Sequence, residues 1–445
     1  MMMLKNENDL KNILNLLLAL IPISFIAGNL FINLNIIVLI LFAFFNFKSQ
    51  IFKYKFSVID KLILFFFFYI LINGILNNYL NFNYPDVENL VLKKTILFIR
   101  FLFLYFVIKF SVKENLINYK TFFASAAVCA VFVSLDVIVQ YSFGKDIFGF
   151  EGSTRRMGGP FGDEYIAGAY IQKFFIFALF FLIFFLKIKN QINFNLFIFI
   201  LISVISLGII FAGNRMPFLI FILTVFAIFI FEKQFRKFFV ISFIIGSIIF
   251  LNIFNSNPQF KMHYSIFKNY SYQIVLFFND RLIGNEIKSS NVYFQNNNIY
   301  VKEFETGFQT WGLNKYFGGG IKSFYWNCNN IKDKLKILFD YDDISCNIHP
   351  HNYYIEILAI LGIVGMFIYL LIITKILYLA IKKIYFNGDL SGKQKYIIPF
   401  FILFMVEIFP LKTTGSFFTT GNATFIFLIL SFLVSLLEYK KNNNE

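Results

Sequence analysis

The chain has 445 residues, of which 58% are hydrophobic, 21% aromatic and only 15% charged, a composition typical of proteins that cross a membrane several times. A water-soluble domain could not bury so much apolar surface, so that class is excluded. The net charge of +15 does not indicate nucleic acid as a partner, because the basic residues form short clusters between apolar stretches, where they orient membrane helices.

Apolar runs long enough to cross the hydrocarbon layer recur along the chain and predict an all-α polytopic membrane protein with about twelve transmembrane helices. The first run follows a charged head, but further runs follow at once, so a retained helix is predicted instead of a cleaved signal peptide. The predicted spans cover residues 12–28, 30–46, 60–78, 91–110, 121–141, 166–186, 195–212, 217–231, 238–253, 353–381, 396–411 and 420–438.

Lysine clusters occur in alternate connections between these spans. By the positive-inside rule, the clustered connections and both termini are predicted to be cytoplasmic, and the other connections periplasmic. The clusters are Lys48, Lys53 and Lys55; Lys109, Lys113 and Lys120; Lys187 and Lys189; Lys233, Arg236 and Lys237; Lys382, Lys383, Lys393 and Lys395; and Lys440 and Lys441.

One long outer connection separates the ninth and tenth spans and divides the chain into residues 1–254, a large periplasmic loop over 255–352, and residues 353–445. A small mixed or mostly helical cap is expected in the loop, with a hairpin at the Asn-rich QNNN segment that ends at Asn298 and a tight turn at the three glycines 318–320. Of the three cysteines, only Cys328 and Cys346 are plausible partners.

Ionisable residues inside the predicted spans are biased toward the outer half of the membrane. Arg100 falls near mid-membrane, Asp136, Lys173 and Glu407 lie within about two turns of the outer end, and Glu356 begins its span there. This bias indicates a cavity open to the outside. The structural alternative is that Arg100 pairs with Asp136 and the others reach the interface. A secondary transporter would need interrupted helices in two related halves, and that pattern is not visible.

The sequence HPHNYYIEILAILGIVG, which starts at His349, joins the long loop to the tenth span. Two of the three histidines of the chain, His349 and His351, are therefore predicted to lie together at the outer end of the tenth span, next to Asn352. A neutral imidazole there could accept a proton from an attacking hydroxyl group. A metal site would need three or four ligands and is not predicted. The structural alternative is a pair of capping or interface histidines.

Four of the six arginines are predicted to be periplasmic, where the positive-inside rule disfavours basic residues: Arg155, Arg156, Arg215 and Arg281. A guanidinium group binds phosphate oxygens in a fork that an ammonium group cannot reproduce. A lipid-linked diphosphate is the anion expected at this face. The alternative is contact with anionic lipid headgroups or loop carboxylates.

The HPHN segment with its following glycines, RRMGGPFGDEYIAG, GNR and the last outer loop FPLKTTGSFFTTGN together resemble the O-antigen ligase-related family of ligases and polymerases. The resemblance implies a metal-independent glycosyltransferase of the GT-C type, without cofactor, in the bacterial inner membrane. Such an enzyme takes a glycan from undecaprenyl diphosphate at the periplasmic face. The acceptor is a hydroxyl of the lipid A core in ligases, another lipid-linked repeat unit in polymerases, and a protein hydroxyl in some members.

The resemblance also implies roles for single residues. His351 matches the acceptor-activating base and Arg215 the arginine that holds the diphosphate. The chain departs from the family pattern in an Asn-rich insertion after Arg281 and in the acidic Glu164. A polymerase, and a transporter of lipid-linked glycan, remain alternatives to a ligase. The other residues expected to bind substrate are Arg155, Arg156, His349, Asn352, Arg100, Lys173 and Arg281.

Overall fold

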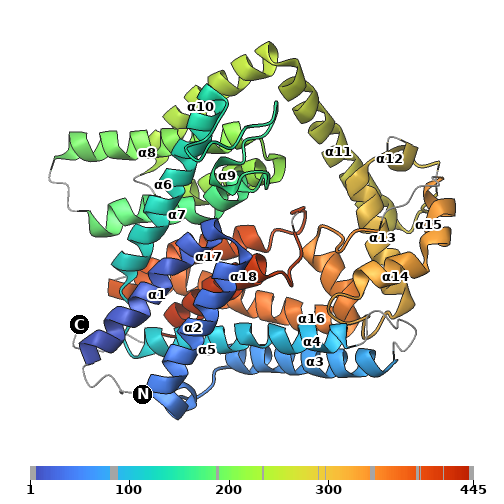
Figure 1. Cartoon of the computed structure of the whole chain (residues 1–445), viewed down its shortest axis with the longest axis horizontal. Coiled ribbons are helices and arrows are strands. Elements are labelled where there is room, and N and C mark those ends of the chain that lie inside the picture. The colour runs from blue at the N-terminus through green and yellow to red at the C-terminus, as the bar shows by residue number, and fades with distance from the viewer. Residues whose placement is uncertain are drawn as a thin grey trace.

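A computed structural model describes residues 7–80, 89–186, 190–232, 235–288, 290–295, 297–340, 346–386, 390, 392–413 and 415–439, and the described chain is helical apart from one isolated β-bridge between Lys145 and Glu151. Figure 1 shows the order of its helices. The first half contains α1 (Glu7–Ala27), α2 (Asn29–Phe47), α3 (Val58–Leu80), α4 (Leu90–Phe98), α5 (Arg100–Lys113), α6 (Tyr119–Phe143), α7 (Ala167–Phe185), α8 (Gln191–Ala212) and α9 (Arg215–Phe231). The second half contains α10 (Arg236–Ser256), α11 (Pro258–Ile283), α12 (Val292–Gln295), α13 (Ile299–Leu313), α14 (Phe324–Asn330), α15 (Lys332–Phe339), α16 (Tyr353–Ile381), α17 (Ile397–Glu407) and α18 (Thr420–Glu438).

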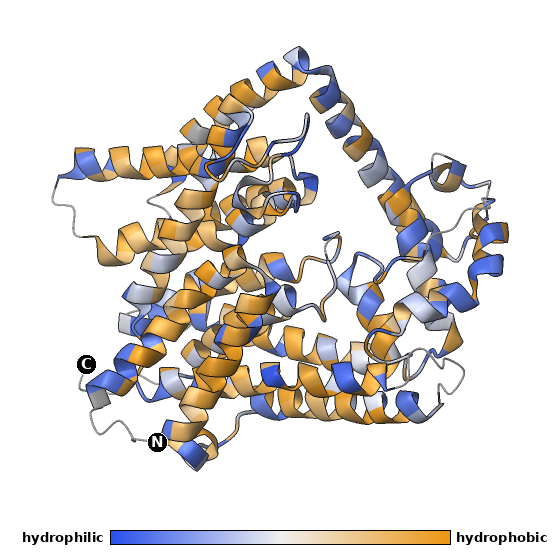
Figure 2. Cartoon of the chain, in the orientation of Figure 1, coloured by the Kyte–Doolittle hydropathy of each residue, from blue (hydrophilic) through white to orange (hydrophobic). Residues whose placement is uncertain are grey.

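Ten helical segments of the described chain are long and apolar enough to cross a membrane, which confirms the all-α polytopic class. Two predicted spans form shorter helices. The span 217–231 lies in α9, which has 17 residues, and the span 396–411 contains α17, which has 11. At 1.5 Å rise per residue, 11 residues cover roughly half of a hydrocarbon layer of about 30 Å. Figure 2 shows hydrophobic residues along the long helices and hydrophilic residues gathered at their ends and on α11–α15.

Asparagine side chains fix where several helices begin. An asparagine at the N-cap accepts hydrogen bonds from backbone N–H groups that have no partner inside the helix. Several of the asparagines of the chain therefore have a structural role as helix caps. Helices with such caps are α6 at Asn118, α8 at Asn190, α11 at Asn257, α13 at Asn298 and α16 at Asn352.

Residues 257–352, called the cap below, form helices α11–α15 around a small apolar core of their own that includes Phe277, Phe304 and Leu335. In Figure 1 the helix α11 leads away from α10 toward this group at the right of the view. The prediction of a helical cap is confirmed. The hairpin predicted at the Asn-rich segment is wrong, because Asn298 accepts from the backbone N–H groups of Tyr300 and Val301 and so starts a helix.

A disulfide bond joins Cys328 of α14 to Cys346, the pairing that the sequence allowed, with the two Cα atoms 5.8 Å apart. It ties the segment that returns to the membrane to the body of the cap. The third cysteine, Cys129, is free and buried in α6.

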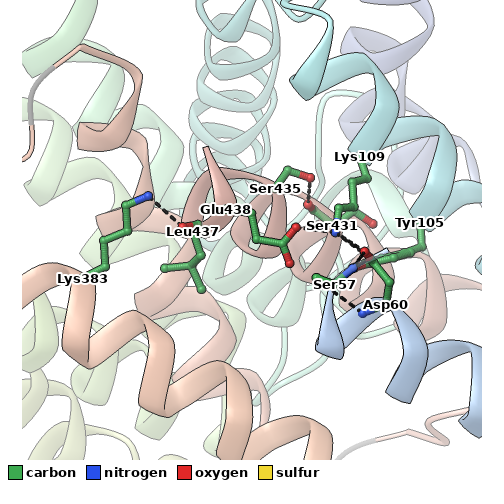
Figure 3. Close-up of polar contacts among 9 residues, drawn as sticks. All are labelled: Ser57, Asp60, Tyr105, Lys109, Lys383, Ser431, Ser435, Leu437 and Glu438. Carbon is green, nitrogen blue, oxygen red and sulfur yellow. Dashed lines mark hydrogen bonds and ion pairs between the residues drawn. The ribbon is translucent and has the colours of Figure 1, made fainter. Parts of the chain in front are cut away.

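The end of the helix bundle away from the cap holds a buried ionic cluster, drawn in Figure 3. The Nζ atom of Lys109 lies 2.6 Å from Asp60 Oδ1 and 2.6 Å from Glu438 Oε2, and Tyr105 donates to Asp60 over 2.7 Å. Lys383 donates to the last carbonyl groups of α18, including that of Leu437 at 2.7 Å. The cluster ties α18 to α3, α5 and the end of α16.

The prediction of a lysine cluster at this end needs one correction. Lys109 is only 3% exposed, because two carboxylates draw it into the bundle, so it is a packing residue and not a surface charge. Five members of the predicted clusters lie outside the described residues: Lys187, Lys189, Lys233, Lys440 and Lys441.

Candidate active site at the cap end of the bundle

The HPHN segment forms the corner where the cap meets α16. The side chain of Asn352 is 3% exposed and accepts from the backbone N–H of Tyr354 at 3.0 Å and of Ile355 at 3.2 Å. Its amide nitrogen donates to the carbonyl of Pro410 over 2.7 Å. Asn352 was predicted to bind substrate, but these bonds occupy it with starting α16 and with bracing the last outer loop. It therefore positions the histidine beside it.

The two histidines of this segment lie against each other, with ring centroids 4.3 Å apart. His351 has a φ of 54°, a conformation that non-glycine residues rarely adopt and that is concentrated at functional sites. Burial, with the positive charges of His351 and Lys322 nearby, lowers the pKa of His349 to about 4. His349 is therefore neutral at pH 7, and neither of its ring nitrogens has a hydrogen-bond partner among the described residues.

Helix α16 is interrupted at Gly362, where φ is 66° and ψ is −169°. The three-glycine turn of the cap inserts at this point and replaces the missing helical hydrogen bonds. Gly319 N–H donates to the carbonyl of Ala359 over 3.1 Å, and Gly320 N–H to that of Ile360 over 2.8 Å. In the other direction, the N–H of Ile363 donates over 2.9 Å and that of Val364 over 3.2 Å to the carbonyls of residues 315 and 316.

Polar side chains of α3 hold the same turn from the membrane side. Tyr69 donates to the carbonyl of Leu361 over 2.6 Å, Asn77 donates to that of Gly318 over 3.1 Å, and Asn73 donates to that of Phe317. Backbone groups exposed by a helix break inside a membrane must find partners within the protein. We call this set of bonds between residues 315–320, α3 and the break in α16 the interlock. It fixes the cap to the membrane helix that begins with the HPHN corner.

Three arginines gather at the start of α9. The Nη2 atom of Arg215 lies 2.6 Å from Nδ1 of His263, and its Nε lies 2.9 Å from Nε2 of the same ring. The turn with Arg155 and Arg156 packs on Gly213, where an added Cβ would collide with the carbonyl of Arg155. Burial, and then the charges of Arg215, Arg156 and Arg155, lower the pKa of His263 to about 4. The neutral ring orients Arg215 without cancelling its charge.

A cavity of about 130 Å³ is lined by residues of α9, α11 and α13 and by the segment that follows α17. Met216, which follows Arg215, lines it from α9, Tyr300 lines it from α13, and Leu411 lines it from the outer loop whose carbonyls accept from Asn352. The cavity thus reaches from the residues beside the arginines to the loop beside the histidines.

A second polar group lies deeper in the bundle. Lys173 is 9% exposed and donates to Asn422 over 2.8 Å, and the Nζ atom of Lys412 lies 2.7 Å from Glu407 Oε2. Tyr353 donates to Glu407 over 3.0 Å. Lys173 and Asn422 also line a separate cavity of about 380 Å³. The structure therefore places Lys173 at this second cavity and gives it a partner that the sequence did not reveal.

Two further predicted residues have structural partners. Arg100 does not pair with Asp136; it donates to the carbonyl of Leu97 over 2.9 Å and to Thr420 over 3.3 Å, at the joint between α4 and α5. Asp136 instead accepts from the N–H of Ile147 over 2.9 Å. The pairing given as the structural alternative is wrong, because Arg100 finds partners on α4 and α18 and Asp136 finds one in the segment that follows its own helix.

Arg281 forms an ion pair with the fully buried Glu305 of α13, so the loop carboxylate proposed as the alternative holds it. Glu164, whose role the sequence left open, is exposed and lines the cavity of Lys173. These two residues do not join the arginine group around Arg215.

Three residues of this region were missed from the sequence. His263 is the third histidine of the chain, and this rarity was its only signal. Lys322 follows the glycine turn and lies close enough to His349 and Glu356 to act on both electrostatically. Burial raises the pKa of Glu303, which accepts from Asn347 of the HPHN approach, to about 7. Lys322 belongs to the GGGIKSF segment, which accompanies the HPHN segment in the family resemblance, but no role for the lysine itself followed from the sequence. His263 and Glu303 stand in no recognisable motif.

The apolar helices define a multi-pass all-α membrane protein. The candidate site lies where the cap meets the membrane helices, near Arg155, Arg156 and Arg215. Residues 198–370 match the family model described as O-antigen ligase, in agreement with the resemblance of the motifs. The matched segment includes Arg215, His263, both histidines of the HPHN corner and Gly362. The match indicates a function of the O-antigen ligase or polymerase type. No curated protein matches the chain.

Proposed function

We propose that the protein is a metal-independent glycosyltransferase at the periplasmic face of the bacterial inner membrane. It transfers a glycan from undecaprenyl diphosphate to a hydroxyl acceptor, with the lipid A core as the leading acceptor. The observation that carries the proposal is that one O-antigen ligase match contains both Arg215 and His351. Met216, the neighbour of Arg215, lines the same cavity as Leu411 of the loop that is bonded to Asn352, the neighbour of His351.

In the proposed step, His351 takes the proton of the acceptor hydroxyl while its oxygen attacks the anomeric carbon of the donor sugar. The bond from that carbon to the diphosphate oxygen breaks with inversion, and the diphosphate leaves with the electron pair. Arg215, with Arg155 or Arg156, stabilises the negative charge that develops on the leaving group. No metal ion is needed for these two tasks, since an imidazole and guanidinium groups can perform them.

The geometry supports this division of roles. His351 has a strained backbone and directly precedes Asn352, whose side chain bonds to the first turn of α16. The position of the His351 side chain is therefore fixed relative to the start of α16. Arg215 is oriented by a neutral histidine and keeps its full charge. A guanidinium in that position presents a fork to a diphosphate, which a lysine does not.

The test is transfer by the purified full-length protein in detergent, with a lipid-linked glycan donor and lipid A core as acceptor. The expected result is that wild type forms the glycosidic bond, His351→Ala does not, and Arg215→Lys is impaired at least about tenfold, since a lost charged hydrogen bond costs about 1.5–3 kcal/mol. Full activity of a folded His351→Ala variant would refute the role of the base.

The same assay separates the alternatives. Joining of lipid-linked repeat units without transfer to lipid A core would identify a polymerase. Formation of no new glycosidic bond by wild type, with either acceptor, would contradict the enzyme and favour a transporter of lipid-linked glycan. In cells lacking the protein, bare lipid A core with glycan retained on the carrier is the pattern expected for loss of a ligase.

A further inference from the structure

We infer that Lys322 is a further binding residue of this site, an ammonium group that the interlock holds at the HPHN corner to receive an anionic oxygen of the lipid-linked glycan. The inference rests on the proposed function for the identity of the substrate. The shared chemistry of the ligand is a phosphate or a sugar carboxylate, and the experiment below distinguishes the two.

The interlock fixes the backbone on which Lys322 stands. Gly320 N–H is bonded to α16, and the following residue, Ile321, is 3% exposed. On the other side of Lys322, the N–H of Ser323 returns to the carbonyl of Gly320 over 3.1 Å, and Phe324 is buried at the start of α14. Lys322 therefore projects from a closed turn whose position is set by the membrane helix that begins at the HPHN corner.

The backbone of Lys322 is strained, with a φ of 75°. A lysine has no side-chain bond to its own backbone that would favour this conformation, as asparagine has, and glycine would adopt it freely. His351 has a φ of 54° at the same corner. Strain of this kind persists where the surrounding structure imposes it, and it is concentrated at functional sites. Lys322 acts electrostatically on His349, whose ring centroid lies 4.3 Å from that of His351, so two strained, ionisable residues of different segments lie in the same region.

The charge of Lys322 is open to a ligand. Its side chain is partly exposed, and it forms no hydrogen bond or ion pair within the part of the chain that the structure describes. It acts electrostatically on His349 and on Glu356. The carboxylate of Glu356 is buried and already accepts from the N–H of Phe417 over 2.7 Å. The ammonium group therefore provides a positive charge near His349, and so at the HPHN corner, on a segment distant in sequence from Arg215.

The first experiment measures binding without catalysis. The chain has two tryptophans, Trp311 and Trp326, and both lie in the cap, so intrinsic fluorescence reports on this region. The full-length protein in detergent is titrated with farnesyl diphosphate, which carries a diphosphate and no sugar, and separately with glucuronate, which carries a carboxylate and no phosphate.

Lys322→Met is expected to weaken binding of one probe at least about tenfold, the loss expected for a hydrogen bond to a charged group. Lys322→Arg should retain binding within a few-fold. Lys315→Met, which removes an exposed lysine from the same loop, is the matched control and should bind as wild type does. Loss for farnesyl diphosphate alone identifies a phosphate site, and loss for glucuronate alone a carboxylate site. Unchanged binding of both probes, or no binding of either by wild type, overturns the inference.

A second pair of variants separates binding from a purely structural role. Lys322→Gly relieves the strained φ and should melt no lower than wild type, yet should lose the same binding. If Lys322 served only to neutralise Glu356, Lys322→Met would lower the melting temperature and the added change Glu356→Gln would restore it without affecting probe binding. That result would overturn the inference.

The two proposals fail independently. If wild type binds farnesyl diphosphate through Lys322 but transfers no glycan, the enzyme assignment fails and the anion site stands. If glycan transfer depends on His351 while Lys322→Met binds and transfers as wild type does, the proposed function stands and Lys322 does not bind the substrate.

Discussion

Replacing Gly362 with alanine tests the interlock directly. At a φ of 66° and a ψ of −169° the backbone is in a region that is essentially restricted to glycine, and a residue with a Cβ costs of order 1–3 kcal/mol there. The new Cβ would also collide with the carbonyl of Tyr316 and the nitrogen of Phe317, so the loop must withdraw. Its four backbone hydrogen bonds to α16, each contributing about 0.5–1.5 kcal/mol, are then lost.

Together these effects predict a loss of about 3–9 kcal/mol, a large fraction of the stability of an ordinary domain. Thermal unfolding of the purified protein in detergent should show a lower melting temperature, and limited proteolysis should cut the released turn around residues 315–320. Gly246→Ala is the matched control, because Gly246 of α10 has open space around its Cβ position and helical alanine is favoured over glycine by about 1 kcal/mol. Equal melting of the two variants would refute the interlock as a stabilising contact.

Three further predictions concern other parts of the molecule. His349 and His263 have pKa values lowered to about 4, so between about pH 6.5 and 4 the unfolded state binds more protons than the folded state. The free energy of unfolding should therefore fall as pH falls, by up to about 1.4 kcal/mol per pH unit for each histidine, as denaturation across this range can measure. Cys328→Ser should cost about 3 kcal/mol, because the bond to Cys346 closes a loop with a sequence separation of 18, and should expose the cap to protease. Lys109→Met should cost about 3–5 kcal/mol in thermal unfolding, because it leaves two carboxylates facing each other in the bundle.

Each of these predictions has a control. Replacing both histidines with glutamine should flatten the pH dependence; the comparison with wild type is needed because Glu303, with its raised pKa, changes stability in the opposite sense. Reducing agent should destabilise wild type and leave Cys328→Ser unchanged; an equal effect on both would contradict the role of the disulfide. Lys113→Met removes an exposed lysine one turn from Lys109. An equal loss of stability in the two variants would contradict the stabilising role of the buried ionic cluster.

The sequence by itself determined the class of the protein and the segments that carry its chemistry. The apolar runs indicated a polytopic helical protein, because backbone groups in a membrane are satisfied inside a helix whatever its neighbours. The HPHN segment and the outer arginines were recognisable because their residue types and spacing are local properties of the chain. The possible cysteine pair followed from counting alone.

Only the tertiary structure decided which residues meet. Asn352 came to donate to the carbonyl of Pro410, Arg281 became the partner of Glu305, and Lys109 was drawn inside the bundle, because each found a group that could satisfy it once the helices had packed. His263 and Lys322 reach the candidate site from distant segments through helix α11 and the interlock. Such contacts depend on loop closure and helix packing over tens to hundreds of residues. No local pattern encodes them, so the site's members had to be found in space.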